Sequence, residues 1–347
     1  MRGLAALAVT FYHFTSTGYD RLYPRDDNLF LFLAVGHQAV SLFFMISGFV
    51  ILMTLDRTKT ISDFAVSRVT RLYPAFWISV LLTFAVVRLC GLPGREASAV
   101  DLLVNLTMLQ HLLDFTAVDG VYWTLHCELC FYVLMALLVA VGLRRHLPAV
   151  LVAIVVCDLI YRSQEIPFYL PSSWRIRSLP DNMHWFAIGV VFYEMRSGWK
   201  PRHLPMLAIC LLAGSYATYY GCPYHQGHPD PHWQQIVCVM GCVALMFVAT
   251  RYNIGLLTSR VLVFMGTISY PLYLLHNNIG IIIIRAGYRQ GLSERSSIAI
   301  ALAATLILAS IVTFTVERPA TAFLREKYKL WKKRREAKAG ATGHPAP

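Results

Sequence analysis

The chain has 347 residues, of which 56% are hydrophobic and only 14% are charged. This composition, with a mean hydropathy of +0.53, excludes an ordinary soluble domain and is typical of a polytopic membrane protein. The net charge of +12 does not indicate a nucleic-acid partner. Much of the excess lies in the C-terminal segment KYKLWKKRREAKAG, where attraction to anionic membrane lipid is the simpler explanation.

Windows of about 20 residues predict an all-α, polytopic integral membrane protein with about ten transmembrane helices. The fifth and sixth apolar windows are shorter than the others. No long polar insertion separates the windows, so the sequence predicts one transmembrane domain over residues 1–324 and a basic cytoplasmic tail over residues 325–347. The predicted spans are 3–18, 34–55, 75–92, 121–143, 147–161, 182–195, 204–220, 233–250, 261–284 and 297–316.

The basic residues predict the orientation of the chain. Arg57, Lys59, Arg144, Arg145 and the basic tail all fall on one side of the membrane when the spans alternate in direction. Because basic residues concentrate in cytoplasmic loops, both termini are expected on the cytoplasmic side. The opening stretch reads as the first span rather than a signal peptide, since it lacks a small-residue cleavage site.

Two connections between spans have a helical pattern. The cytoplasmic segment ISDFAVSRVTRLYPAFW places Arg68 and Arg71 on one face of a helix, because residues three apart are neighbours there. Pro74 is expected to mark the turn into the third span. The external segment DLLVNLTMLQHLLDF, residues 101–115, predicts an amphipathic helix on the outer surface.

Three ionisable side chains lie inside predicted spans, where each is costly and therefore a candidate for function. At 1.5 Å per helical residue, His13 lies about 16 Å from Arg2. By the same rise, Glu128 lies about 9 Å below the outer end of its span, and His276 lies about 22 Å from Val261. A shared polar cavity would need all three at this depth. Structural hydrogen bonds between helices are the alternative.

These residue types suit acyl or proton transfer. A neutral imidazole such as His13 can take a proton from an acceptor hydroxyl, and a carboxylate such as Glu128 can orient that imidazole. Arg2, Arg68 and Arg71 can hold a phosphorylated donor at the inner face. Taken singly, each of these arginines is equally well explained as a residue that sets the orientation of the chain.

Other candidate sites have simpler explanations. Ser47 beside Gly48 offers a nucleophile, but close helix packing through small residues is favoured. Cys127 and Cys130 have no nearby activating cation and are expected to pack. The external segment GCPYHQGHPDPHW contains metal-ligating residue types without a zinc spacing, so no metal site is expected.

Five segments, in order along the chain, resemble motifs of the membrane-bound acyltransferase 3 family, which includes O-acetyltransferases of bacterial surface polysaccharides. They match its Arg, ten residues, His motif; its Phe-rich segment ending Ser-Gly; its Arg-x-x-Arg-x-x-Pro segment; its Trp-Thr-Leu, Glu, Phe-Tyr segment; and its Ser-Tyr, Leu-Tyr, His segment. Each motif is weak alone, whereas the ordered set is specific. The segments are MRGLAALAVTFYH, SLFFMISGFVI, SRVTRLYPAFW, VYWTLHCELCFY and GTISYPLYLLH.

The resemblance implies transfer of an acyl group, usually acetyl from acetyl-CoA, to a hydroxyl of a carbohydrate or lipid-linked glycan at the bacterial cytoplasmic (inner) membrane. It implies no tightly bound cofactor. By carry-over, His13 is expected to be the catalytic base with Glu128 as the second catalytic residue, and Arg2, Arg68 and Arg71 are expected to bind the donor. The residues expected to line the substrate pocket are Ser47, Tyr122, Trp123, Ser269, Tyr270 and His276.

Two other functions use the same residue types. A proton-coupled transporter or permease for a small polar solute also carries ionisable residues in its spans, but inverted repeats with broken helices are not evident. A non-catalytic sensor or assembly subunit would use these residues to join helices. The sequence leaves open the acceptor, the acyl length, the side of the membrane where transfer occurs, a covalent intermediate, homo-oligomerisation and the position of the true N-terminus.

Overall fold

A computed structural model describes residues 1–15, 36–163, 179–220, 224–225, 228–229, 232–252 and 254–341. Its described residues are helical apart from turns and a ladder of two very short strands, so the all-α prediction is confirmed. The α-helices are α1 Arg2–Thr15, α2 Ala39–Arg57, α3 Ile61–Cys90, α4 Ala99–Asn105, α5 Gln110–Leu113, α6 Trp123–Ala140, α7 Leu147–Ser163, α9 Met183–Met195, α10 His203–Tyr220, α11 His232–Arg251, α12 Arg260–Arg289, α13 Glu294–Val312 and α14 Arg318–Ala341. The other elements are η2 Gly120–Tyr122, η3 Leu143–His146, η4 Pro180–Asn182, β1 Tyr224–His225, β2 His228–Pro229, η5 Gly255–Thr258 and η6 Thr313–Glu317.

Each predicted span overlaps one of these helices, and the chain is a polytopic membrane protein. Within the described residues, 6 helical stretches are long and apolar enough to cross a bilayer. The remaining predicted spans fall on α1, α7, α9 and α10, so the number of about ten crossings stays a prediction. The 6 stretches are Gly36–Arg57, Ile61–Cys90, Gly120–Ala140, Trp233–Arg251, Arg260–Arg289 and Glu294–Ala337.

The expected turn at Pro74 is wrong, because α3 runs through this residue as one continuous helix. Proline has no N–H, so the carbonyl of Thr70, four residues earlier, loses its helical donor. The hydroxyl of Thr321 in α14 donates to that carbonyl at 2.9 Å. A contact from a distant segment thus satisfies the group that proline leaves without a partner. The helix begins where the Thr60 hydroxyl accepts from the backbone N–H of Asp63.

The prediction of one continuous outer helix over residues 101–115 is also wrong. The structure has two short helices, α4 and α5, in its place. Met108 between them has a φ of 67°, a left-handed conformation that ends a helix. The Asn105 side chain donates to the Thr116 carbonyl at 2.8 Å and accepts from the Val118 N–H at 3.0 Å. These bonds fold the connection back on itself instead of extending it.

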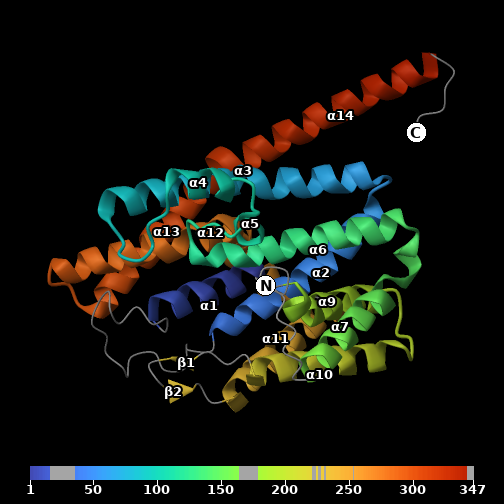
Figure 1. Cartoon of the computed structure of the whole chain (residues 1–347), viewed down its shortest axis with the longest axis horizontal. Helices are drawn as coiled ribbons and strands as arrows, with labels where there is room; N and C mark the ends of the chain where they lie inside the picture. The colour runs from blue at the N-terminus through green and yellow to red at the C-terminus, as the bar shows by residue number, and fades with distance from the viewer. Residues whose placement is uncertain are drawn as a thin grey trace.

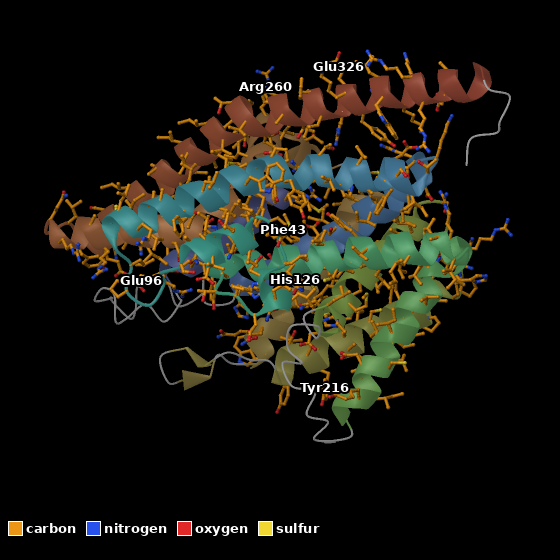
Figure 2. The ribbon with its side chains drawn as sticks, turned by 45° about the horizontal axis from the view of Figure 1, so that its top comes forward. Phe43, Glu96, His126, Tyr216, Arg260 and Glu326 are labelled. Carbon is orange, nitrogen blue, oxygen red and sulfur yellow. The ribbon has the colours of Figure 1, made fainter. Side chains whose placement is uncertain are left out.

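The longer helices lie side by side along a common direction, with α14 extending away from the bundle at one end (Figure 1). Phe43 lies in the middle of the bundle and Tyr216 at its margin (Figure 2). Helix α12 packs against α1, α3 and α13, and α2 packs against α9. Glycine allows α2 and α9 to touch: a Cβ on Gly48 would lie 2.1 Å from the Phe186 carbonyl oxygen. Small-residue packing is therefore confirmed at Gly48.

A buried carboxylate ties the outer connection to α12. Asp119 is 0% exposed and accepts from the Asn277 side chain at 2.7 Å and from the backbone N–H groups of Asn278 at 3.0 Å and Val121 at 3.3 Å. Burial raises the pKa of Asp119 above its ordinary value, while these hydrogen bonds act in the opposite direction. The Asp119 carboxylate fixes η2 against the helix that carries His276.

The C-terminal segment continues the last predicted span without a break. Helix α13 passes through the π-helical turn η6 into α14, which crosses the predicted domain boundary at residue 324 and ends at Ala341. Along α3, Tyr328 and Lys332 of α14 donate to the Asp63 carboxylate at 3.0 and 2.8 Å. Helix α14 is therefore fixed to the bundle as far as Lys332.

Candidate active site

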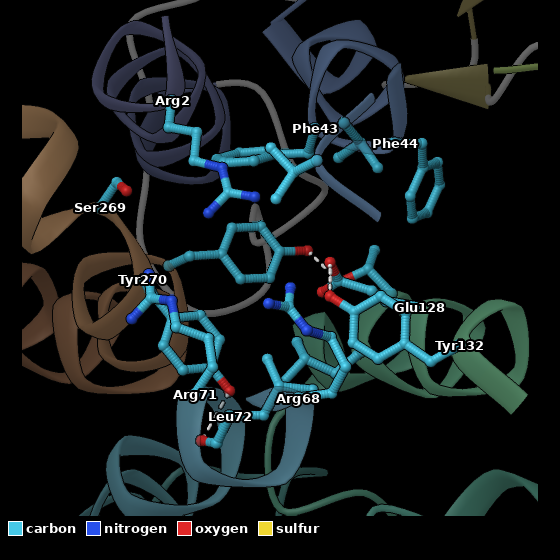
Figure 3. A pocket seen from close by; sticks show the side chains of 15 residues that line it. Arg2, Phe43, Phe44, Arg68, Arg71, Leu72, Glu128, Tyr132, Ser269 and Tyr270 are labelled. Atoms are coloured by element: carbon cyan, nitrogen blue, oxygen red, sulfur yellow. Dashed lines mark hydrogen bonds between the residues drawn. The ribbon is translucent and has the colours of Figure 1, made fainter. Parts of the chain in front are cut away.

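Helices α1, α2, α3, α6 and α12 surround a pocket with a volume of about 170 Å³ (Figure 3). Apolar side chains such as Phe43 and Phe44 of α2 form part of its wall. The residues predicted for the site that line this pocket are Arg2, Arg68, Arg71, Glu128, Ser269 and Tyr270. Segments far apart in the sequence thus meet in one partly polar cavity.

The Glu128 carboxylate is held by two hydroxyl groups. Ser47 of α2 donates a hydrogen bond to Oε1 of Glu128, and Tyr132 of α6 donates to the same oxygen at 2.5 Å. Ser47 is 3% exposed, and its hydroxyl is directed at this carboxylate. Ser47 therefore orients Glu128, while its neighbour Gly48 makes the helix contact.

The guanidinium groups enter the pocket from two helices. On α3, Arg68 lies 5.8 Å from the ring centroid of Tyr132, and Arg71 lies 5.3 Å from that of Tyr270, so both are placed by aromatic faces. Arg2 reaches the pocket from the start of α1 (Figure 3). The predicted shared face of Arg68 and Arg71 agrees with this geometry. Several guanidinium groups in one cavity suit a phosphorylated ligand.

The two histidines of the predicted site form a pair. Nδ1 of His13 lies 2.8 Å from Nε2 of His276, and Nδ1 of His276 lies 3.1 and 2.9 Å from the carbonyl oxygens of Leu272 and Tyr273. Carbonyl oxygens only accept, so Nδ1 of His276 carries a proton, and with the imidazole assigned as neutral its Nε2 carries the lone pair. His13 must then donate from Nδ1, which leaves the lone pair of His13 on Nε2.

Of the three ionisable side chains at membrane depth, the pocket contains one. Glu128 lines the pocket, whereas the two histidines are not among its lining residues. The partner of Nδ1 of His13 is the imidazole of His276 rather than a carboxylate such as that of Glu128. The reason is direction: Glu128 points from α6 towards α2, while the histidines face each other across α1 and α12.

Tyr273 lies between the pocket and the histidine pair. It lines the pocket, and its ring centroid is 5.7 Å from that of His276. Its hydroxyl donates to the Val121 carbonyl at 3.2 Å and lies 2.8 Å from the Thr124 hydroxyl. The two parts of the site are therefore adjacent, with a fixed aromatic ring at their border.

Two predicted pocket residues support the wall without lining it. Tyr122 is buried, and its ring packs edge-on against Phe76 at 5.3 Å. Trp123 packs edge-on against Phe44 at 6.0 Å. His126 turns away from Glu128, as its spacing on the helix predicts, and its Nε2 lies 3.5 Å from the Sγ of Cys130.

The candidate metal ligands of the external loop are only partly described. Cys222 and Asp230 lie outside the described residues. Among the residues that the structure describes, no group of three His, Cys, Asp or Glu side chains is placed to hold a metal ion.

Three residues of the site were missed by the sequence analysis. Tyr132 lies one helical turn after Glu128, a spacing that brings the two side chains together. Tyr273 lies three residues after Tyr270, a spacing that places both side chains on one face of α12. Glu317 follows directly after the predicted end of the last span at residue 316 and reads as a membrane-interface residue, yet it pairs with Arg71.

The chain is similar in sequence to known acyltransferases. A family model described as an acyltransferase domain matches residues 1–314. The chain is 26% identical, over 80% of its length and 80% of the relative, to a protein of the Acidianus two-tailed virus whose name describes it as an acetyltransferase, ORF330. It is 25% identical, over 93% of its length and 91% of the relative, to Acyltransferase MdmB of Streptomyces mycarofaciens. No solved structure matches the chain significantly.

Proposed function

The chain belongs to the membrane-bound acyltransferase 3 family, and from this premise we propose that it transfers an acetyl group from acetyl-CoA to a hydroxyl of a carbohydrate or lipid-linked glycan. The family establishes a membrane acyltransferase. The donor, the acceptor and the roles of individual residues are the proposal. Its support is that α1 carries both His13, which pairs with His276, and Arg2, which lines the arginine-rich pocket.

The donor binds with its phosphates near Arg2 and Arg68. Neither side chain forms an ion pair with a carboxylate among the described residues, so both offer their N–H groups to an anion. A volume of about 170 Å³ is below the ~300 Å³ of pockets that enclose a whole ligand. The pocket therefore takes a part of acetyl-CoA, and the flexible pantetheine arm carries the thioester past Tyr273 towards the histidine pair.

Transfer takes place at His13. Its Nε2 accepts the proton of the acceptor hydroxyl while the hydroxyl oxygen attacks the thioester carbonyl carbon. The C–S bond then breaks, and the leaving thiolate of CoA takes the proton back from Nε2, so the products are an ester and free CoA. General-base catalysis of this kind contributes ~10²–10⁴-fold. Nε2 of His276 accepts from Nδ1 of His13 and stabilises the imidazolium that forms.

Direct transfer fits the contacts better than a covalent relay through Ser47. That hydroxyl is buried and donates to Glu128, and it does not line the pocket. Glu128 acts within the pocket, where its charge offsets that of the nearby guanidinium groups and keeps the donor arm oriented. His13 depends on His276 instead.

The proposed location is the bacterial inner membrane with both termini cytoplasmic. This orientation puts Arg2, Arg68 and α14 on the side where acetyl-CoA is made. The basic face of α14 binds anionic lipid near the inner surface.

The test uses a strain that lacks the gene, complemented with wild-type protein, His13→Gln or His146→Gln. His146 is an exposed histidine of η3 and serves as the matched control. Mass spectrometry of cell-surface glycans is expected to show the added mass of an acetyl group for wild type and His146→Gln, and none for His13→Gln. Full acetylation by His13→Gln, at protein levels equal to wild type in immunoblots, would contradict the assignment.

A further inference from the structure

The last long helix contains a π-helical turn with a buried acid at its end. The turn, η6, covers Thr313–Glu317 between α13 and α14. Such turns are rare and occur frequently at functional sites. The side chain of Glu317 is 5% exposed. A buried carboxylate is costly unless it is paired, so its place in the bundle needs a reason.

The partner of Glu317 is an arginine of the pocket. Oε1 of Glu317 forms an ion pair with the guanidinium of Arg71. Oε2 of Glu317 is buried, and no group within the described parts of the chain donates a hydrogen bond to it. The Glu317 carboxylate therefore pairs with Arg71 through Oε1, while Oε2 accepts no hydrogen bond from the described residues.

Arg71 is fixed from two sides. Glu317 holds one edge of its guanidinium, and the ring of Tyr270 lies 5.3 Å away. Tyr270 is in turn anchored by its hydroxyl, which donates to the Leu72 carbonyl at 3.1 Å. A guanidinium has five N–H donors and a carboxylate engages at most two of them, so Arg71 keeps donors for the pocket.

Helix α14 fastens the π-turn to α3 next to Arg71. Thr321 donates to the Thr70 carbonyl at 2.9 Å, and Nε of Arg325 lies 3.5 Å from the Thr70 hydroxyl. On α3 both contacts are made by Thr70, one residue before Arg71, and on α14 they come from the first two turns after Glu317. The position of the Glu317 carboxylate relative to Arg71 is thus set by several independent bonds.

Charge gives the pairing a function in the pocket. Arg2, Arg68 and Arg71 line one small cavity, and like charges this close repel each other. Arg2 and Arg68 have no carboxylate partner among the described residues, while Arg71 has Glu317. Neutralising one of three guanidinium groups lets all three remain in the cavity before an anionic donor enters.

We infer that Glu317 is a positioning residue for the acyl donor: it holds Arg71 in the orientation in which the remaining N–H groups of Arg71 contact the CoA portion. This inference rests on the proposed function, because it assumes that acyl-CoA enters the pocket. Glu317 does not touch the donor and acts through Arg71.

The test measures binding of CoA to the full-length protein in lipid nanodiscs by isothermal titration calorimetry. Glu317→Gln keeps the shape of the side chain and removes its charge. The matched control is Glu326→Gln on the same helix, where Glu326 is exposed and projects away from the bundle (Figure 2). The Kd of CoA is expected to rise about tenfold in Glu317→Gln, the loss of one charge-assisted contact, and to stay unchanged in Glu326→Gln.

A role limited to joining helices predicts a different result. In that case Glu317→Gln lowers the thermal stability and leaves the Kd of CoA as in wild type, which would overturn the inference. Positioning also predicts that Arg71→Gln with Glu317→Gln binds CoA no more weakly than Arg71→Gln alone, since both changes act on one contact. Additive losses would equally overturn it.

A variant with the two charges exchanged tests the inference even if Glu317→Gln does not fold. Arg71→Glu with Glu317→Arg retains an ion pair between α3 and η6 and moves the guanidinium out of its place. It is expected to fold and to bind CoA as weakly as Arg71→Gln, whereas wild-type affinity would refute the inference. If the wild-type protein itself does not bind CoA, the proposed donor site is wrong. If the wild-type protein binds CoA and Glu317→Gln binds it with the same Kd, the donor site stands and only the inference about Glu317 is wrong.

Discussion

Replacing His276 by phenylalanine tests how the structure sets the reactive nitrogen of His13. Nε2 of His276 is the acceptor for Nδ1 of His13 at 2.8 Å, and His276 is 0% exposed. Phenylalanine keeps a ring in this buried position and removes the acceptor. The change therefore acts on the tautomer of His13 and on the imidazolium that the proposed mechanism forms.

The magnitude follows from the hydrogen bond that is lost. A hydrogen bond to a charged group contributes about 1.5–3 kcal/mol, and each ~1.36 kcal/mol is a factor of ten in rate. His276→Phe is expected to lower kcat by about 10–150-fold. The KM for acetyl-CoA is expected to stay near the wild-type value, because His276 is not among the residues that line the pocket proposed for the donor. His276→Gln is expected to retain part of kcat, since its Oε1 can accept from His13.

The assay follows release of the CoA thiol by purified protein in nanodiscs, with acetyl-CoA and a glycan acceptor taken from the host strain. Thermal unfolding of each variant identifies losses that come from folding. Because both histidines act as one unit, His13→Gln with His276→Phe is expected to be no slower than His13→Gln alone. A wild-type kcat in His276→Phe, or losses that multiply in the double variant, would refute the role assigned to the pair.

Three further predictions concern the frame of the site. Asp119→Ala removes an acceptor shared by three buried N–H groups and is expected to lower the free energy of unfolding by about 2–5 kcal/mol. Asp119→Asn is expected to lower it by less, and equal losses for the two variants on denaturation in mixed micelles would count against this. Gly48→Ala puts a Cβ 2.1 Å from the Phe186 carbonyl oxygen and is expected to cost about 1–3 kcal/mol; an unchanged melting temperature would contradict the close contact. Burial, and then the nearby His126, lower the pKa of His111 from 6.5 to about 4. Because the unfolded chain binds this proton more readily, stability is expected to fall as the pH drops from 6.5 towards 4, and His111→Gln should flatten the melting temperature in this range.

The two wrong predictions about helix continuity share one cause. Proline is a good sequence signal for the end of a helix, but Pro74 is tolerated because Thr321, far along the chain, donates to the carbonyl that proline leaves free. Conversely, the apolar pattern of residues 101–115 favours one helix, and tertiary bonds to Asn105 divide it. In both places a long-range hydrogen bond decided what the local pattern left undecided.

The sequence by itself determined the class of the protein and the charged residues of its pocket, Arg2, Arg68, Arg71 and Glu128. Hydropathy identified the helices, because the hydrocarbon core admits few other structures, and the spacing of Arg68 and Arg71 on one helix fixed their common face. The tertiary structure decided the partners of each polar group. Only the packing of α1 against α12 joins His13 to His276, and only the π-turn brings Glu317 to Arg71. The depth of a side chain follows from helical rise along one span, but its neighbour depends on how separate helices are rotated and packed.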